Sequence, residues 1–197
     1  NPLSICGPDV SMNIPNLLTV LRVLLIPVFV LLFYLPFSWS HLAASAVFAF
    51  AAATDWLDGY LARRLQQSTP FGAFLDPVAD KLIVAVALVL LVDEHASLWL
   101  TLPAVVIISR EIVVSALREW MAQIGASKSV AVHMLGKVKT TVQMVAIPFL
   151  LYDGRLFGFI DTGVWGTWLI WIAAVLTVWS MVYYLQKALP EIRAKAK

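Results

Sequence analysis

The chain has 197 residues, of which 61% are hydrophobic and 13% are charged, and its mean hydropathy is +0.86. Soluble domains carry about 25% charged residues, so this composition excludes a soluble globular protein and indicates an integral membrane protein. The formal net charge of +2 is too small to favour nucleic-acid binding. The single cysteine, Cys6, excludes an internal disulfide and a metal site built from several cysteines.

Six apolar segments are long enough to cross a bilayer, which takes about 20 residues. We expect residues 1–11, a polar lead with proline and glycine, to be a fusion remnant, and residues 12–197 to form one domain. The predicted spans are residues 17–35, 41–65, 71–92, 98–121, 130–152 and 162–185. The sequence therefore predicts an all-α integral membrane protein with six transmembrane helices.

Basic residues gather on one side of these spans. The first and third connecting segments have no lysine or arginine, and the fifth has Arg155 against Asp153 and Asp161. Because cytoplasmic segments are enriched in lysine and arginine, the basic side and both termini are predicted to face the cytoplasm. The residues on that side are Arg63, Arg64, Arg118, Lys128, Lys137, Lys139, Lys187, Arg193, Lys195 and Lys197.

Four aspartates lie within one short stretch at the predicted cytoplasmic face. They are Asp55 and Asp58 in DWLDGYLAR and, eight residues later, Asp76 and Asp80 in GAFLDPVAD. A carboxylate within hydrocarbon costs roughly 2.5–3.5 kcal/mol, and neighbouring carboxylates repel one another, so we expect bound cations. Each pair shares one face of a helix. Such oxygen ligands suit Mg²⁺ or Mn²⁺, and two ions could clamp a phosphoryl group during in-line displacement.

Small residues accompany the aspartates. Gly59, Ala62 and Gly72 leave the helix surfaces bare, so a nucleotide could lie against the backbone. Arg63 is placed to meet a phosphate. Two alternatives stay open: the glycines could serve close helix packing, and the aspartates could form interfacial salt bridges with Arg63, Arg64 and Lys81. Spacing also leaves open which carboxylate would accept a proton.

Four further cations occupy the fourth and fifth predicted spans and their cytoplasmic ends. Arg110, Arg118, Lys137 and Lys139 are predicted to converge on the face that carries the aspartates. Several lysine and arginine donors suit a phosphate, so we expect a phosphate-bearing acceptor there. Alternatively, Arg110 could pair with Glu111 and Arg118 with Glu119, and the lysines could begin a solvated helix.

The string D-x-x-D-G-x-x-A-R-x8-G-x-x-x-D-x-x-x-D resembles the signature of the CDP-alcohol phosphotransferases at every specified position. The resemblance covers the chain from Met12 onward and implies the fold of that family, in a homodimer of the bacterial inner membrane. It implies that two divalent ions are held by the four aspartates, and that an acceptor hydroxyl displaces CMP from a CDP-linked donor. Asp80, with Asp76 beside it, is then the candidate catalytic base. The implied donor contacts are Asp58, Gly59, Ala62, Arg63 and Gly72.

Within this family, the strings IPNLLTVLR, SREIVVSALREW and GKVKTT look like those of members that join CDP-diacylglycerol to sn-glycerol 3-phosphate. This likeness suggests Asn16 and Thr19 as donor contacts and Arg22 as a contact of the acceptor phosphate. Asn16 and Thr19 could instead cap the first helix. The same chemistry with inositol phosphate, serine or phosphatidylglycerol as acceptor remains an alternative. A divalent-cation transporter is a rival of another class, but acidic residues of a conduit should recur at several depths.

Overall fold

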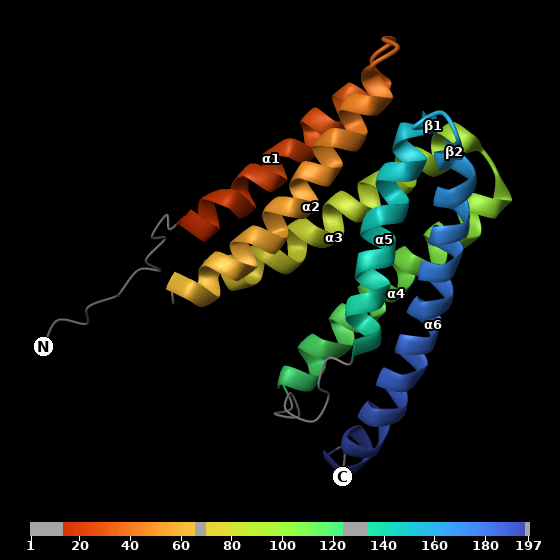
Figure 1. The fold of residues 1–197 in the computed structure, drawn as a ribbon. Coiled ribbons are helices and arrows are strands. Elements are labelled where there is room, and N and C mark those ends of the chain that lie inside the picture. The colour runs from red at the N-terminus through yellow and green to blue at the C-terminus, as the bar shows by residue number, and fades with distance from the viewer. Residues whose placement is uncertain (1–13, 66–69, 124–133, 196–197) are drawn as a thin grey trace, which may run out of the picture. The chain divides into compact units, whose positions relative to one another are not determined.

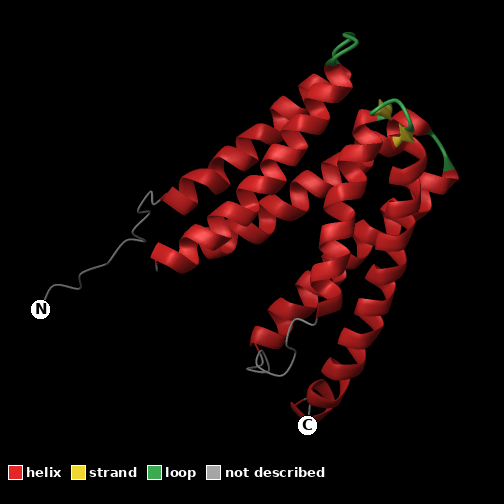
Figure 2. Cartoon of the chain, viewed as in Figure 1, coloured by secondary structure: helices red, strands yellow, loops and turns green. Residues whose placement is uncertain are grey.

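The computed structural model describes the backbone of residues 14–65, 70–123 and 134–195, and the side chains of residues 17–55, 57, 72, 75–123 and 138–186. These residues form six helices and one two-stranded hairpin (Figure 1 and Figure 2). The elements are α1 (Ile14–Tyr34), α2 (Ser40–Leu65), α3 (Pro70–His95), α4 (Leu98–Gln123), α5 (Met134–Tyr152), β1 (Arg155–Leu156), β2 (Ile160–Asp161) and α6 (Thr162–Lys195).

The six predicted spans correspond to α1–α6, and Leu35 is their one described residue outside a helix, so the prediction of an all-α membrane protein is confirmed. Residues 1–11 and 130–133 lie outside the described residues, and α6 continues ten residues beyond the predicted end at 185. In the described chain, three helices are long and apolar enough to cross a membrane, within Leu17–Tyr34, Leu98–Gln123 and Thr162–Gln186. Part of α2 and the start of α3 lie outside the described side chains, and the count of six spans stays a prediction.

Residues 1–86 form one compact unit, in which α1 and α2 pack side by side (Figure 1). The rings of Phe29 on α1 and Phe48 on α2 are fully buried, with centroids 6.2 Å apart. Ala44 and Ala51 are buried on α2, two turns apart. Small residues at such positions let two helices approach closely. This contact fixes α1 against the helix that carries the first aspartate pair.

Residues 87–197 form the second unit, in which α6 packs against α5 and α4. Gly166 marks the close approach of α6 to α5, because a Cβ there would lie 2.7 Å from Cγ of Leu150 and 3.0 Å from its backbone nitrogen. At the same end of α6, the indole nitrogen of Trp171 donates to the carbonyl of Trp99 at 2.9 Å. These contacts set the register of α6 against both neighbours.

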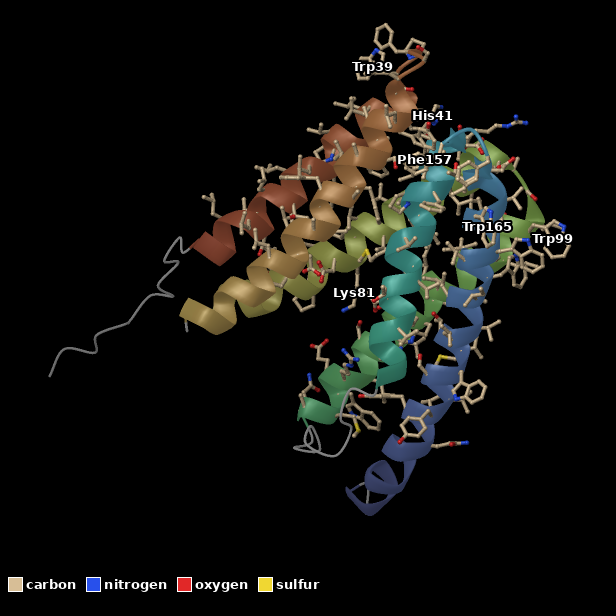
Figure 3. The ribbon with its side chains drawn as sticks, viewed as in Figure 1. Trp39, His41, Lys81, Trp99, Phe157 and Trp165 are labelled. Atoms are coloured by element: carbon tan, nitrogen blue, oxygen red, sulfur yellow. The ribbon has the colours of Figure 1, made fainter. Side chains whose placement is uncertain are left out.

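A hairpin absent from the sequence prediction joins α5 to α6. Arg155 pairs with Asp161, and Gly158 at the turn has a φ of +80°, which glycine adopts without strain. The Thr162 hydroxyl donates to the Gly154 carbonyl at 2.8 Å and so closes the base of the hairpin. Exposed aromatic side chains crowd this end of the unit, among them Phe157, Trp99 and Trp165 (Figure 3). Aromatic residues of this kind are typical of a membrane–water interface.

Candidate active site

Arg22 joins the two halves of the aspartate motif. This residue of α1 is 1% exposed, and its Nη1 donates to Oδ1 of Asp55 on α2 at 3.0 Å and to Oδ1 of Asp80 on α3 at 2.5 Å. Because one nitrogen contacts both carboxylates, two residues 25 positions apart in the sequence lie at one place in the first unit. Both carboxylates are about one-third exposed, so they remain open to solutes.

A second contact from α1 reaches the same motif. The hydroxyl of Thr19, which is fully buried, donates to Oδ1 of Asp76. Thr19 lies one turn before Arg22 on α1, and Asp76 lies one turn before Asp80 on α3. Two adjacent turns of α1 therefore face two adjacent turns of α3, and α1 orients three of the four aspartates.

The described part of this cluster has the donor chemistry of a site for hard divalent cations. Its carboxylate and hydroxyl oxygens are ligands that Mg²⁺ and Mn²⁺ prefer. Asp58 follows Asp55 by three residues on α2, and its side chain lies outside the described set. Within the described side chains, no three acidic, histidine or cysteine residues lie close enough together to hold an ion. The residues present fit a metal site whose remaining predicted ligand is Asp58.

The second unit contains a buried ionic cluster. Oε1 of Glu111 on α4 accepts from Arg110 Nη1 at 3.1 Å and from Lys139 Nζ on α5. Arg110 Nη2 also donates to the hydroxyl of Ser180 on α6 at 3.1 Å. The side chains of Arg110 and Lys139 are 10% and 5% exposed. Side chains from three helices therefore meet in one cluster. Its two cations outnumber its one carboxylate, so the cluster has an excess of positive charge.

The alternative pairings considered from the sequence have mixed outcomes. Arg110 pairs with Glu111, as one of the alternatives predicted. Lys139 contacts the same oxygen of Glu111, Oε1. Arg118 is exposed and its guanidinium lies 6.0 Å from the ring centre of Tyr184 on α6. Gly72 is buried on α3. The remaining predicted contacts have side chains outside the described set: Asn16, Asp58, Gly59, Ala62, Arg63 and Lys137.

Several partners in these two clusters were not predicted from the sequence. The cation that Asp55 and Asp80 share among the described side chains is Arg22, which was not among the cations predicted for the aspartates. Two of those predicted cations, Arg63 and Arg64, lie outside the described side chains. Ser180 was overlooked, although a hydroxyl near the centre of an apolar helix is a signal for a buried polar partner. Which helix faces which is a tertiary property, so sequence spacing could not select these pairs.

Comparisons with known proteins agree with the motif. Residues 12–179 match the family model described as CDP-alcohol phosphatidyltransferase. The chain is 63% identical over 190 residues to a Pseudomonas fluorescens protein named CDP-diacylglycerol–glycerol-3-phosphate 3-phosphatidyltransferase, covering 94% of this chain and 95% of the relative. It is 57% identical over 176 residues to a protein of the same name from Escherichia coli strain K12, covering 89% and 94%.

Proposed function

This chain belongs to the CDP-alcohol phosphatidyltransferase family, and we propose that it transfers the phosphatidyl group of CDP-diacylglycerol to sn-glycerol 3-phosphate. The products are phosphatidylglycerophosphate and CMP. Relatives of 57–63% identity over about nine-tenths of the chain carry the name of this reaction. The structural observation that carries the proposal is the guanidinium nitrogen shared by Asp55 and Asp80, because it brings the two halves of the motif together.

The four aspartates are the proposed holders of two divalent cations, Mg²⁺ or Mn²⁺. Such ions, when bound, neutralise the charge of the donor pyrophosphate and of the leaving CMP. The contacts from Arg22 and Thr19 support this role, because they orient the carboxylates of Asp55, Asp76 and Asp80. Thr19 brings no charge to Asp76, so its hydroxyl can fix this carboxylate as the hydrogen-bond partners of metal ligands do.

The acceptor hydroxyl must lose a proton as it attacks. Its oxygen forms a bond to the phosphorus that carries diacylglycerol, and the bond from that phosphorus to CMP breaks. We assign the proton to a carboxylate of α3, with Asp80 as the first candidate and Asp76 as the second. Donor contacts are assigned to Thr19 and Gly72 and, outside the described side chains, to Asn16, Asp58, Gly59, Ala62 and Arg63.

The phosphate of glycerol 3-phosphate is the proposed ligand of the basic cluster. Arg110 and Lys139 are held in place by Glu111 and carry more positive charge than that carboxylate balances. A second anion would complete the balance, and phosphate accepts several hydrogen bonds from such donors. Arg118 and Lys137 are assigned as further contacts of the same phosphate. Arg22, first assigned to it as well, has its described contacts with Asp55 and Asp80.

We place the protein in the bacterial inner membrane as a homodimer, with both termini and the aspartates at the cytoplasmic face. The distribution of lysine and arginine among the connecting segments supports this orientation. Single cysteines introduced at exposed sites into a Cys6→Ser background test it. Gly158→Cys should react with an impermeant maleimide added outside the cytoplasmic membrane, and Gln123→Cys should react only after lysis. The reverse pattern contradicts the orientation.

The choice of acceptor is tested directly with purified protein, CDP-diacylglycerol, Mg²⁺ and radiolabelled alcohols. The panel contains sn-glycerol 3-phosphate, inositol phosphate, serine and phosphatidylglycerol. Only glycerol 3-phosphate should give a new labelled lipid, with one CMP released for each lipid formed. Asp76→Asn is the matched inactive control, because it removes one negative charge at nearly constant volume. Labelling by another acceptor, with none from glycerol 3-phosphate, contradicts the assignment.

A further inference from the structure

Arg22 is a buried cation outside the aspartate motif. It lies 33 residues from Asp55 and 58 residues from Asp80, yet its Nη1 contacts both. Its side chain is 1% exposed and belongs to the most apolar helix of the chain. A guanidinium in such surroundings is costly unless it meets an opposite charge. Asp55 and Asp80 supply that opposite charge, so the guanidinium is an integral part of the cluster.

The charge of Arg22 acts directly on the carboxylates proposed as metal ligands. Two carboxylates at one place repel each other, and a cation between them offsets that repulsion. The contacts of the guanidinium therefore favour the close approach of Asp55 and Asp80. A divalent ion near the same oxygens is repelled by this guanidinium, because like charges at a few ångströms interact strongly at the low dielectric of a protein.

We propose that Arg22 is a resident counter-ion of the metal site, which assembles the carboxylates and competes with divalent cations for them. This inference rests on the proposed metal-dependent function and adds a residue that sets the affinity for the metal. The guanidinium keeps the aspartate pair assembled at low metal concentration and lowers the affinity of the pair for divalent ions. Arg22 is thus a positioning residue that acts through Asp55 and Asp80.

A different role for the same contacts predicts the opposite change. If the guanidinium only oriented the carboxylate oxygens, as hydrogen-bond partners of metal ligands do, its removal would weaken metal binding. If Arg22 is a counter-ion, its removal strengthens metal binding, because the metal then meets less repulsion and relieves more repulsion between Asp55 and Asp80. The sign of the change in metal affinity separates the two roles.

The experiment measures Mn²⁺ binding to the full chain in detergent micelles, by the loss of the free Mn²⁺ electron paramagnetic resonance signal. Arg22→Gln removes the charge, Arg22→Lys keeps it, and Lys81→Gln is the matched control. Lys81 carries the same charge and directly follows Asp80 in the sequence of α3; its side chain is labelled in Figure 3. We expect Arg22→Gln to bind Mn²⁺ about tenfold more tightly than the wild type, and the other two variants to stay within about twofold of it.

The rise in Tm that Mn²⁺ produces is a second readout, and a merely structural role of Arg22 would not enlarge it. In excess chelator, Arg22→Gln should have a lower Tm than the wild type, and saturating Mn²⁺ should raise its Tm by more than it raises that of the wild type. Should Arg22→Gln be unfolded in chelator, Mn²⁺ should restore its fold. A variant that stays unfolded at saturating Mn²⁺ overturns the proposal.

The remaining outcomes are equally decisive. Unchanged or weaker Mn²⁺ binding by folded Arg22→Gln overturns the counter-ion role while leaving the metal site intact. An equal gain in affinity from Lys81→Gln overturns it too, because the effect would then belong to net charge and not to the contacts of Arg22. Failure of the wild type to bind Mn²⁺ instead refutes the metal site of the proposed function, on which this inference rests.

Discussion

Replacing Glu111 by glutamine is expected to destabilise the protein, because this carboxylate holds two buried cations. Its Oε1 accepts from Arg110 Nη1 at 3.1 Å and from Lys139 Nζ, and the side chains of the two cations are 10% and 5% exposed. Removing one partner of a buried ion pair costs roughly 3–5 kcal/mol. Glu111 itself is 23% exposed, and solvent screening puts the loss near the lower end, at about 3 kcal/mol. For a chain of this size, that corresponds to a fall in Tm of roughly 6–12 °C.

The assay is thermal unfolding of the purified variant, followed by far-ultraviolet circular dichroism. Glu119→Gln is the matched control, because this glutamate is exposed on the same helix and should change stability by no more than about 0.5 kcal/mol. Adding Lys139→Met to Glu111→Gln removes one of the two cations left without their carboxylate. The free energy of unfolding of the double variant should therefore be about 1.5 kcal/mol higher than the sum of the two single effects predicts. A Tm for Glu111→Gln equal to that of Glu119→Gln, or strictly additive effects, would refute the reasoning.

Three further changes test other parts of the structure. Arg118→Ala should raise the KM for glycerol 3-phosphate more than that for CDP-diacylglycerol in CMP-release assays, and an effect on the lipid donor alone would mean the assignment is wrong. Thr19→Val removes the hydroxyl that orients Asp76, so it should lower kcat about tenfold while changing Tm little. A variant whose kcat equals that of the wild type would contradict this prediction. Gly166→Ala should lower Tm, since its Cβ would lie 2.7 Å from Leu150 Cγ and overpacking costs about 1–3 kcal/mol; an unchanged Tm would show room between α5 and α6.

The helices could be predicted from the sequence because long apolar runs bounded by charge, proline and glycine leave few alternatives in a membrane protein. The β1–β2 hairpin could not, because its strands are two residues each and depend on the turn at Gly158. The length of α6 was underestimated for a related reason. Five of its last ten residues, 186–195, are polar or charged, and such residues mark where an apolar run ends but not where a helix ends.

The candidate site could be predicted only as a set of residue types. The spacing of the four aspartates indicates two helix faces, and α2 and α3 do bring Asp55 and Asp80 to a common partner. The sequence analysis assigned this partner, Arg22, to the acceptor phosphate. A cation in an apolar helix indicates that an opposite charge lies nearby, but the sequence does not show which group carries that charge. The same limit applies to Lys139, whose carboxylate partner lies 28 residues away on α4.

The central claim is that the aspartates hold divalent cations that phosphatidyl transfer requires. Its most direct test is CMP release from CDP-diacylglycerol and glycerol 3-phosphate by the purified protein, while a chelator removes divalent ions and Mg²⁺ or Mn²⁺ restores them. We predict that release stops in chelator, returns with either ion, and stays absent in a folded Asp76→Asn variant. Undiminished release in excess chelator, or full activity without the Asp76 carboxylate, would contradict the claim.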